Sequence, residues 1–163
     1  MTLDDIISMG QTPVVAEKKN PLGEPGETVK HNVKRLRESV GLSYAELARK
    51  LDSLGRPIPV LGLSRIEKGE RRVDADDLVA LAIALDASPI ALLMPETVEE
   101  SEPASLMGKP ITAREMWNWL RGDQLPDALE GNALAFVVRS RPRWTINLEM
   151  PAPTIEVDGR ELK

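Results

Sequence analysis

The sequence predicts an all-α domain of five short helices, followed by a small C-terminal extension that is helical or mixed α+β. Three observations predict this fold. Apolar residues between positions 28 and 95 recur at spacings of three and four, which places them on one face of successive helices. Helix-capping and helix-ending residues divide the same stretch into short segments. Aromatic residues are scarce, with three Trp, one Tyr and one Phe, so the core must be mainly aliphatic.

Charge and composition limit the class of protein. The 163 residues carry a net charge of −5, yet residues 28–95 hold 11 Lys and Arg against 9 Asp and Glu, so this segment is net basic. That balance permits a nucleic-acid partner without identifying one. The absence of cysteine excludes a disulfide framework and indicates a cytoplasmic protein. We expect no membrane span, because no run of 18 apolar residues is present, and no secretory signal, because the N-terminus is acidic with no basic segment before an apolar one.

The first two helices follow a flexible N-terminal arm. Residues 1–27 combine Gly, Pro and charged residues without a sustained period, apart from one expected helical turn around residues 3–8. From Thr28, apolar residues at positions 29, 33, 36 and 40 predict a helix that Gly41 ends. Ser43 and Glu46 then form an S-x-x-E capping box, which predicts a second helix running to about residue 53.

Three more helices complete the predicted domain. Pro59 suits the first turn of a third helix, which Gly69 ends and whose buried side carries Leu63 and Ile66. Asp74 is placed to cap a fourth helix, and Ser88 with Pro89 opens a short fifth one. The predicted domain therefore covers residues 28–95.

The C-terminal third contains fewer signals. Residues 96–110 resemble an acidic linker, and Thr112 with Glu115 forms a second capping box that starts a helix ending near Gly122. Residues 133–139 are apolar enough to pack, as either helix or strand. Residues 139–144 are a basic, Trp-bearing patch that either contacts nucleic acid or forms a surface loop sealing a small core. Alternation from residue 145 onward, with an Asp-Gly turn, predicts a hairpin. An extension this short has a marginal core, so we expect residues 111–163 to serve association.

Three segments in order carry a resemblance to a known family. GLSYAELARKL, LSRIEKGERRV and DLVALAIALDASPIALL, all within residues 28–95, resemble the lambda-repressor-like, XRE-type helix-turn-helix regulators (Cro and CI among them). The resemblance implies a five-helix DNA-binding domain. It also implies that the third helix enters the major groove while the second crosses the DNA backbone.

The resemblance also implies residue roles. Arg65 is the principal base-reading candidate, because a guanidinium can bond guanine O6 and N7 together. Arg37 and Glu67 match an internal salt bridge and are assigned to the scaffold. The base-facing positions are Val60, Leu61, Ser64 and Arg65; the phosphate-facing positions are Ser43, Tyr44, Lys68, Arg71 and Arg72.

Two departures from the family pattern affect the predicted interface. The turn between Leu51 and Ile58 is longer than usual, which adds Arg56 as a phosphate contact. Val60 and Leu61 are apolar where polar side chains are expected. Either they press on thymine methyl groups, or the residues that read the bases lie in the 54–59 loop.

These inferences predict a sequence-specific regulator of transcription that binds double-stranded DNA. We expect a phage-type or actinobacterial repressor that reads the major groove of its operator with helix 60–68 and is a homodimer, at least on DNA. We expect no enzyme, because the sequence shows no acid–base pair, metal cluster or phosphate loop, and we expect no cofactor. Two alternatives stay open. One is an antitoxin of a toxin–antitoxin pair, and the other is a protein-interaction adaptor that has lost DNA binding. In either, the C-terminal region would hold a protein partner.

Overall fold

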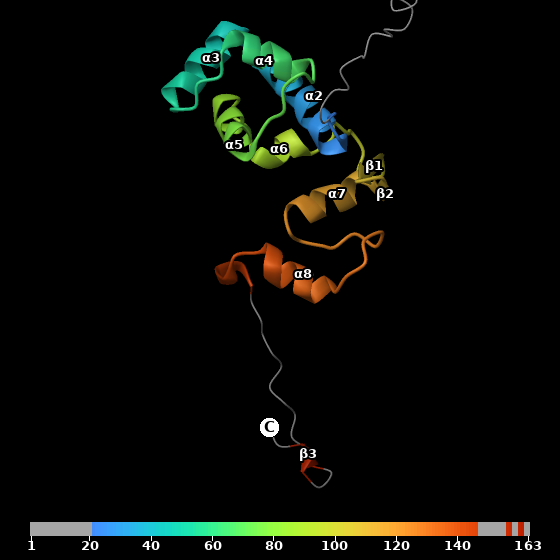
Figure 1. Cartoon of the computed structure of the whole chain (residues 1–163). Helices are drawn as coiled ribbons and strands as arrows, with labels where there is room; N and C mark the ends of the chain where they lie inside the picture. The colour runs from blue at the N-terminus through green and yellow to red at the C-terminus, as the bar shows by residue number, and fades with distance from the viewer. Residues whose placement is uncertain (1–20, 147–155, 158–159, 162–163) are drawn as a thin grey trace, which may run out of the picture. The chain divides into compact units, whose positions relative to one another are not determined.

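The chain divides into two compact units, residues 1–96 and residues 97–163, which are described separately. The computed structural model describes residues 21–146 together with two short strands at 156–157 and 160–161 (Figure 1). The helical turn expected around residues 3–8, and most of the predicted N-terminal arm, lie outside the described residues. Within the described part of the chain, no helix is both long and apolar enough to span a bilayer.

The first unit is a bundle of five short helices, α2 to α6, around one interior (Figure 1). This confirms the predicted fold class. The helices are α2 (Glu24–Ser39), α3 (Tyr44–Ser53), α4 (Val60–Glu67), α5 (Ala75–Ala84) and α6 (Pro89–Leu93). Helices α3 to α6 have ten residues or fewer, too few to be stable alone, so each depends on packing its apolar face. The largest buried apolar side chains are Val33, Leu47, Leu51, Ile58, Leu63, Ile66, Leu81, Leu85 and Leu92.

The predicted helix caps are confirmed. At the start of α3, the Ser43 hydroxyl accepts a hydrogen bond from the Glu46 amide, and the Glu46 carboxylate accepts one from the Ser43 amide. Asp74 caps α5 by accepting from the Asp77 amide at 2.7 Å, and Ser88 caps α6. Because capping satisfies amides that a helix cannot satisfy itself, these short-range signals fix where each helix begins.

The predicted start of the first helix at Thr28 is wrong, because α2 already begins at Glu24. Pro25 and Gly26 suggested a flexible arm, but proline is well tolerated in a first helical turn, where its missing N–H has no intrahelical acceptor. Glu24 and Glu27 lie in the same turn, where negative charge is favourable. The added turn brings Leu22 close to Gly69, at the exit of α4.

A buried amide joins the first and last helices of this unit. Asn32 is fully buried on α2, and its side-chain amide donates to the carbonyls of Leu92 at 3.1 Å and Met94 at 2.8 Å. Its carbonyl oxygen accepts from the guanidinium of Arg35. Asn32 thereby satisfies the carbonyl groups at the end of α6, which a helix terminus leaves without partners.

The second unit begins with a hairpin where the sequence predicted an acidic linker over residues 96–110. Strand β1 (Pro103–Leu106) pairs antiparallel with β2 (Lys109–Thr112), so the linker assignment is wrong for residues 103–110. Met107 and Gly108 both have positive φ, 52° and 83°, as the tightest hairpin turns require. Met-Gly is a weak turn signal, because methionine rarely adopts that conformation. Leu106 and Ile111 are the buried side chains of the hairpin.

Two helices follow the hairpin. Helix α7 (Ala113–Leu120) packs against both strands, and the predicted Thr112–Glu115 capping box is confirmed at its start. Residues 133–139 prove helical, within α8 (Ala133–Ser140), which Asn132 caps by accepting from the Ala135 amide at 2.8 Å. A 3₁₀ turn, η1 (Arg143–Thr145), comes next. Trp144 is exposed on it, so among the described residues this side chain seals no core.

The predicted C-terminal hairpin is present in part. Strand β3 (Glu156–Val157) pairs antiparallel with β4 (Arg160–Glu161). The Asp-Gly turn expected between them, and most of the strand expected over residues 145–150, lie outside the described residues.

Candidate nucleic-acid interface

Helix α4 has one buried face and one exposed face. Leu63 and Ile66 point into the core, whereas Val60 and Leu61 are 46% and 61% exposed. Ser64 is half-buried, and Arg65 and Lys68 are exposed. The helix starts after Pro59 and ends at Gly69, whose φ of +73° is the left-handed conformation that glycine adopts most easily. The predicted base-facing residues therefore lie on the solvent side of one short helix.

Arg65 differs from the other arginines near α4. Its guanidinium has no acceptor among the described residues, whereas those of Arg37, Arg56 and Arg71 are held by carboxylates. Arg72 donates to the Pro21 carbonyl. An unengaged guanidinium keeps its donors for an external acceptor.

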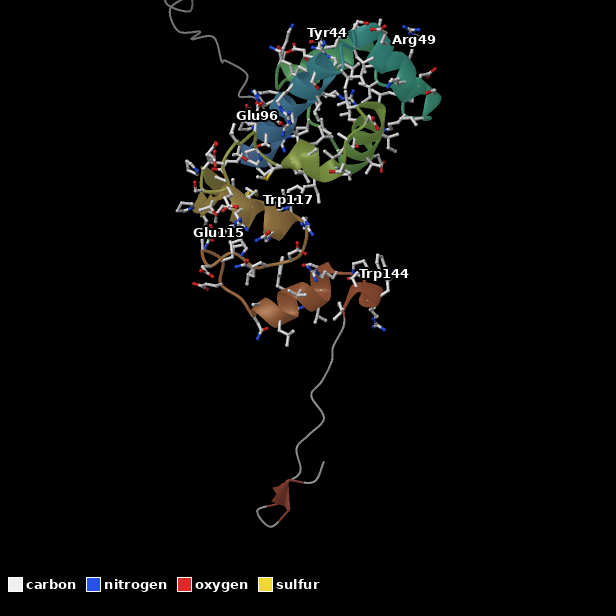
Figure 2. The ribbon with its side chains drawn as sticks, turned by 180° about the vertical axis from the view of Figure 1, so that it is seen from behind. Tyr44, Arg49, Glu96, Glu115, Trp117 and Trp144 are labelled. Carbon is white, nitrogen blue, oxygen red and sulfur yellow. The ribbon has the colours of Figure 1, made fainter. Side chains whose placement is uncertain are left out.

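The start of α3 lies at a second predicted contact position. Figure 2 labels Tyr44 at this end of α3 and Arg49 further along the helix. The capping box occupies the Ser43 amide and hydroxyl. The N–H groups of Tyr44 and Ala45, in contrast, find no acceptor in the described part of the chain. Free N–H groups at a helix start favour an anion.

A charged network connects α2, α3 and α4. Arg37 donates from Nε to Oε1 of Glu67 at 2.7 Å and from Nη2 to Oε2 at 3.0 Å, a two-bond pairing. The Tyr44 hydroxyl donates to the same Oε2 at 2.7 Å, and the Arg37 guanidinium lies 4.4 Å from the Tyr44 ring centre. The bond to Glu67 raises the pKa of Arg37 and that of Tyr44. Glu67 is 3% exposed, so this network belongs to the scaffold.

Arg56 and Arg71, both predicted to contact phosphate, donate to one carboxylate of α5. Arg56 Nε lies 2.7 Å from Oδ1 of Asp77, and Arg71 Nη2 lies 2.8 Å from its Oδ2. Arg56 also donates to Asp74 at 2.7 Å. The hydrogen bond to Asp77 raises the pKa of Arg56, and the Asp77 amide lowers the pKa of Asp74. These two arginines therefore have internal partners that the sequence did not reveal.

Sequence reasoning missed Asp77 as a residue that supports this site. Asp77 follows the cap residue Asp74 by three positions, where an acidic residue is common for helix-dipole reasons alone. Nothing local in the sequence shows that its partners come from positions 56 and 71. The Tyr44 side chain, taken as a phosphate contact, is half-buried with its hydroxyl on Glu67.

Comparison with known proteins defines the class. Residues 33–92, which run from within α2 to α6, match the model of the helix-turn-helix family. Comparison with curated proteins gave no match, and comparison with solved structures gave none either. Residues 33–92 are a helix-turn-helix domain of the lambda-repressor-like kind. The chain that carries this domain is a DNA-binding regulator of transcription.

Proposed function

We propose that the chain binds specific sequences of double-stranded DNA by placing α4 in the major groove. The observation that carries this proposal is the exposed face of α4, where Arg65 has no acceptor among the described residues while Arg56 and Arg71 are held by carboxylates. The groove admits a helix, and a guanidinium recognises the O6 and N7 atoms of guanine. Arg65 is therefore assigned to a guanine, with Ser64 beside it.

Val60 and Leu61 contact thymine methyl groups in this proposal. Both are exposed apolar side chains in the first turn of α4, on the solvent side of the helix. Exposed apolar groups gain from burial, and a thymine methyl in the major groove is an apolar surface of matching size. Placement of the two residues on α4 supports this role over the alternative in which the 54–59 loop reads the bases.

Phosphate contacts come from two places. Lys68 and Arg72 lie at the exit of α4, and the free backbone N–H groups of Tyr44 and Ala45 at the start of α3 favour an anion. Ser43 caps this helix start, and its own amide and hydroxyl are bound to Glu46. Neutralising phosphates releases condensed cations, so affinity falls steeply as salt rises. Arg56 and Arg71 are withdrawn from this group, because carboxylates of α5 hold both of them.

The second unit pairs two copies of the chain. Helix α8 has no buried residue, and Leu134 and Val138, one turn apart, are 64% and 43% exposed. Its other side contacts the second unit, because an atom added at Gly122 would lie 2.8 Å from Ser140. An exposed apolar helix face of this kind favours association. Two copies suit a helix-turn-helix domain, whose operators consist of paired half-sites.

The biological role that follows is a cytoplasmic, non-enzymatic repressor of the phage or actinobacterial type. The resemblance of residues 28–95 to the lambda-repressor-like regulators supports this role, since such proteins act by occupying operators. An antitoxin or an adaptor would use the exposed face of α8 for a different protein instead.

Selection of bound fragments from random duplex DNA by the full-length chain tests the proposal. We expect enrichment of one sequence with two symmetric half-sites, with centres about 34–36 Å apart or a multiple of that distance. No enrichment and no mobility shift at low salt, together with a stable complex to another protein, would contradict it and favour the adaptor.

A further inference from the structure

The Asp77 carboxylate is buried, and two arginines compensate its charge. Its side chain is 1% exposed on α5, and a buried carboxylate is unfavourable unless cations and hydrogen bonds compensate it. Arg56 and Arg71 supply both, one at each carboxylate oxygen. A carboxylate bound on both oxygens by guanidinium groups is held in position.

The two arginines flank α4 in the chain. Arg56 lies in the extended turn before the helix, and Arg71 lies just beyond Gly69, at its exit. Each of the two segments that flank α4 therefore carries an arginine that binds the same carboxylate of α5, that of Asp77. A helix of eight residues contributes little order of its own, so its position depends on such attachments.

Gly62 allows the second attachment. A Cβ atom added at this position of α4 would lie 2.9 Å from Nη1 of Arg71 and 3.1 Å from Cγ2 of Ile58. The Arg71 side chain therefore lies directly against α4 at Gly62 on its way to Asp77. The Arg71 atom is the far end of a flexible side chain, so a methyl group there displaces the guanidinium, and the buried Ile58 side chain must also shift by a few tenths of an ångström.

The charges around Asp77 favour a positioning role over phosphate binding. Arg56 also lies 2.7 Å from Asp74 and 3.6 Å from Asp76, so the two arginines face three carboxylates. A group of charges that is not net positive has little attraction for DNA. The two ion pairs on the buried Asp77 carboxylate instead connect the segments flanking α4 to α5.

We propose that Asp77 is a positioning residue, which holds the recognition helix α4 in its DNA-reading orientation through Arg56 and Arg71. Its effect on sequence discrimination rests on the proposed function, whereas its effect on the mobility of α4 does not. Small displacements of a recognition helix weaken base contacts, whose geometry is strict, more than phosphate contacts.

Amide hydrogen exchange tests the attachment without DNA. Gly62→Ala and Arg71→Gln should raise exchange of the α4 amides roughly tenfold relative to those of α3, as expected for loss of a hydrogen bond to a charged group. Gly62→Ala is the sharper variant, because it keeps Arg71 and Asp77 and adds one methyl group to α4, where alanine has the higher helix propensity. Asp76→Asn is the matched control, since it removes a carboxylate that is 82% exposed and should leave exchange unchanged.

Binding measurements test the consequence. The probes are a duplex that the wild-type chain selects from a random library and a randomised duplex of equal length. With Asp77→Asn, Arg71→Gln and Gly62→Ala, the ratio of the two affinities should fall about tenfold, while binding to the randomised duplex is retained. A purely structural role would lower both affinities together, in proportion to the unfolded fraction, and cooling would restore them.

The outcomes separate the two proposals. If Gly62→Ala and Arg71→Gln are folded and leave α4 exchange at the wild-type level, positioning by Asp77 is overturned, whatever Asp77→Asn does. An unchanged affinity ratio in the same folded variants overturns it as well. If the wild-type chain selects no sequence, the proposed function fails, and the exchange data alone decide whether Asp77 holds α4.

Discussion

Arg65 carries most of the proposed base recognition because its guanidinium is exposed and unengaged. Arg65→Ala should weaken binding to the selected duplex by roughly 1–3 kcal/mol and relax the preference at one base pair. Binding to random DNA should change little. Competition binding with single-base variants of the selected duplex measures both quantities.

Lys68→Ala is the control for that experiment. Lys68 is exposed at the end of α4, where we place a phosphate contact. Its loss should weaken all duplexes about equally and reduce the slope of log affinity against log salt by about one. Equal losses on selected and random DNA for Arg65→Ala would instead assign Arg65 to the backbone.

Acid should destabilise the first unit partly through Glu46. Hydrogen bonds from the Ser43 side chain and backbone lower the pKa of Glu46 below its ordinary value of 4.5. A carboxylate whose pKa is lower when folded stabilises the fold above its unfolded pKa, and this contribution is lost as pH falls through the folded pKa. Urea unfolding between pH 6 and pH 3 should therefore show less pH dependence for Glu46→Gln than for the wild type. Identical slopes would exclude the cap carboxylate as a source of acid sensitivity.

At the scale of elements, the carboxylate of Glu67 joins three helices. Because it is 3% exposed and Arg37 is 11% exposed, Glu67→Ala leaves a poorly solvated guanidinium with only the exposed Glu38 carboxylate and the Leu42 carbonyl as partners. This variant should lower the free energy of unfolding by about 3–5 kcal/mol. Tyr44→Phe removes one hydrogen bond but keeps the ion pair, so it should cost about 1 kcal/mol. Urea denaturation measures both, and similar losses would mean that the tyrosine bond, not the ion pair, is the main link.

How much of the fold the sequence predicts depends on the range of the interactions involved. Ser43, Asp74, Ser88 and Thr112 each cap a helix through an amide three residues away, so their positions were predictable from local sequence. The early start of α2 and the Met107–Gly108 turn were not predictable in this way. Pro25 and Gly26 usually indicate an irregular segment, and methionine rarely adopts a positive φ.

The candidate site also has one part that local sequence predicts and one part that depends on long-range packing. The exposed side of α4 follows from burial of Leu63 and Ile66, which helical spacing already predicts. The attachment of Arg56 and Arg71 to Asp77 spans 21 and 6 residues, and it depends on how α5 packs in the finished domain. The sequence alone predicts phosphate contacts for Arg56 and Arg71. Only the structure shows that the Asp77 carboxylate binds both guanidinium groups instead.

For the whole molecule, the proposed pairing of two copies gives α8 a specific arrangement. Its N-terminal end follows the exposed residue Glu130, and its last turn and the residues beyond carry the exposed residues Arg139 and Arg143. In an antiparallel pair, Leu134 of one copy faces Val138 of the other. Glu130 of each copy then lies beside the basic end of its partner helix, so that opposite charges meet twice in a symmetric interface.

This arrangement makes an unusual prediction for two single variants. Glu130→Arg and Arg139→Glu should each weaken self-association of the full-length chain, because like charges then meet at both ends. Exposed pairs contribute about 0.2–1 kcal/mol each, so each dissociation constant should rise roughly tenfold over the two sites. An equimolar mixture should associate like the wild type, since one variant presents Arg at both positions and the other Glu.

Sedimentation of the two variants, separately and mixed, measures their self-association. Leu134→Asp is a control that removes the apolar contact. Leu134→Asp should abolish pairing alone and in every mixture, because the apolar face supplies the affinity and the charges supply the orientation. In a parallel pair, Glu130 would meet Glu130 and Arg139 would meet Arg139, so each single variant alone would leave self-association unchanged. The mixture would then associate more tightly than the wild type, because opposite charges would meet at both ends. Association that survives Leu134→Asp would place the contact between copies elsewhere on the chain.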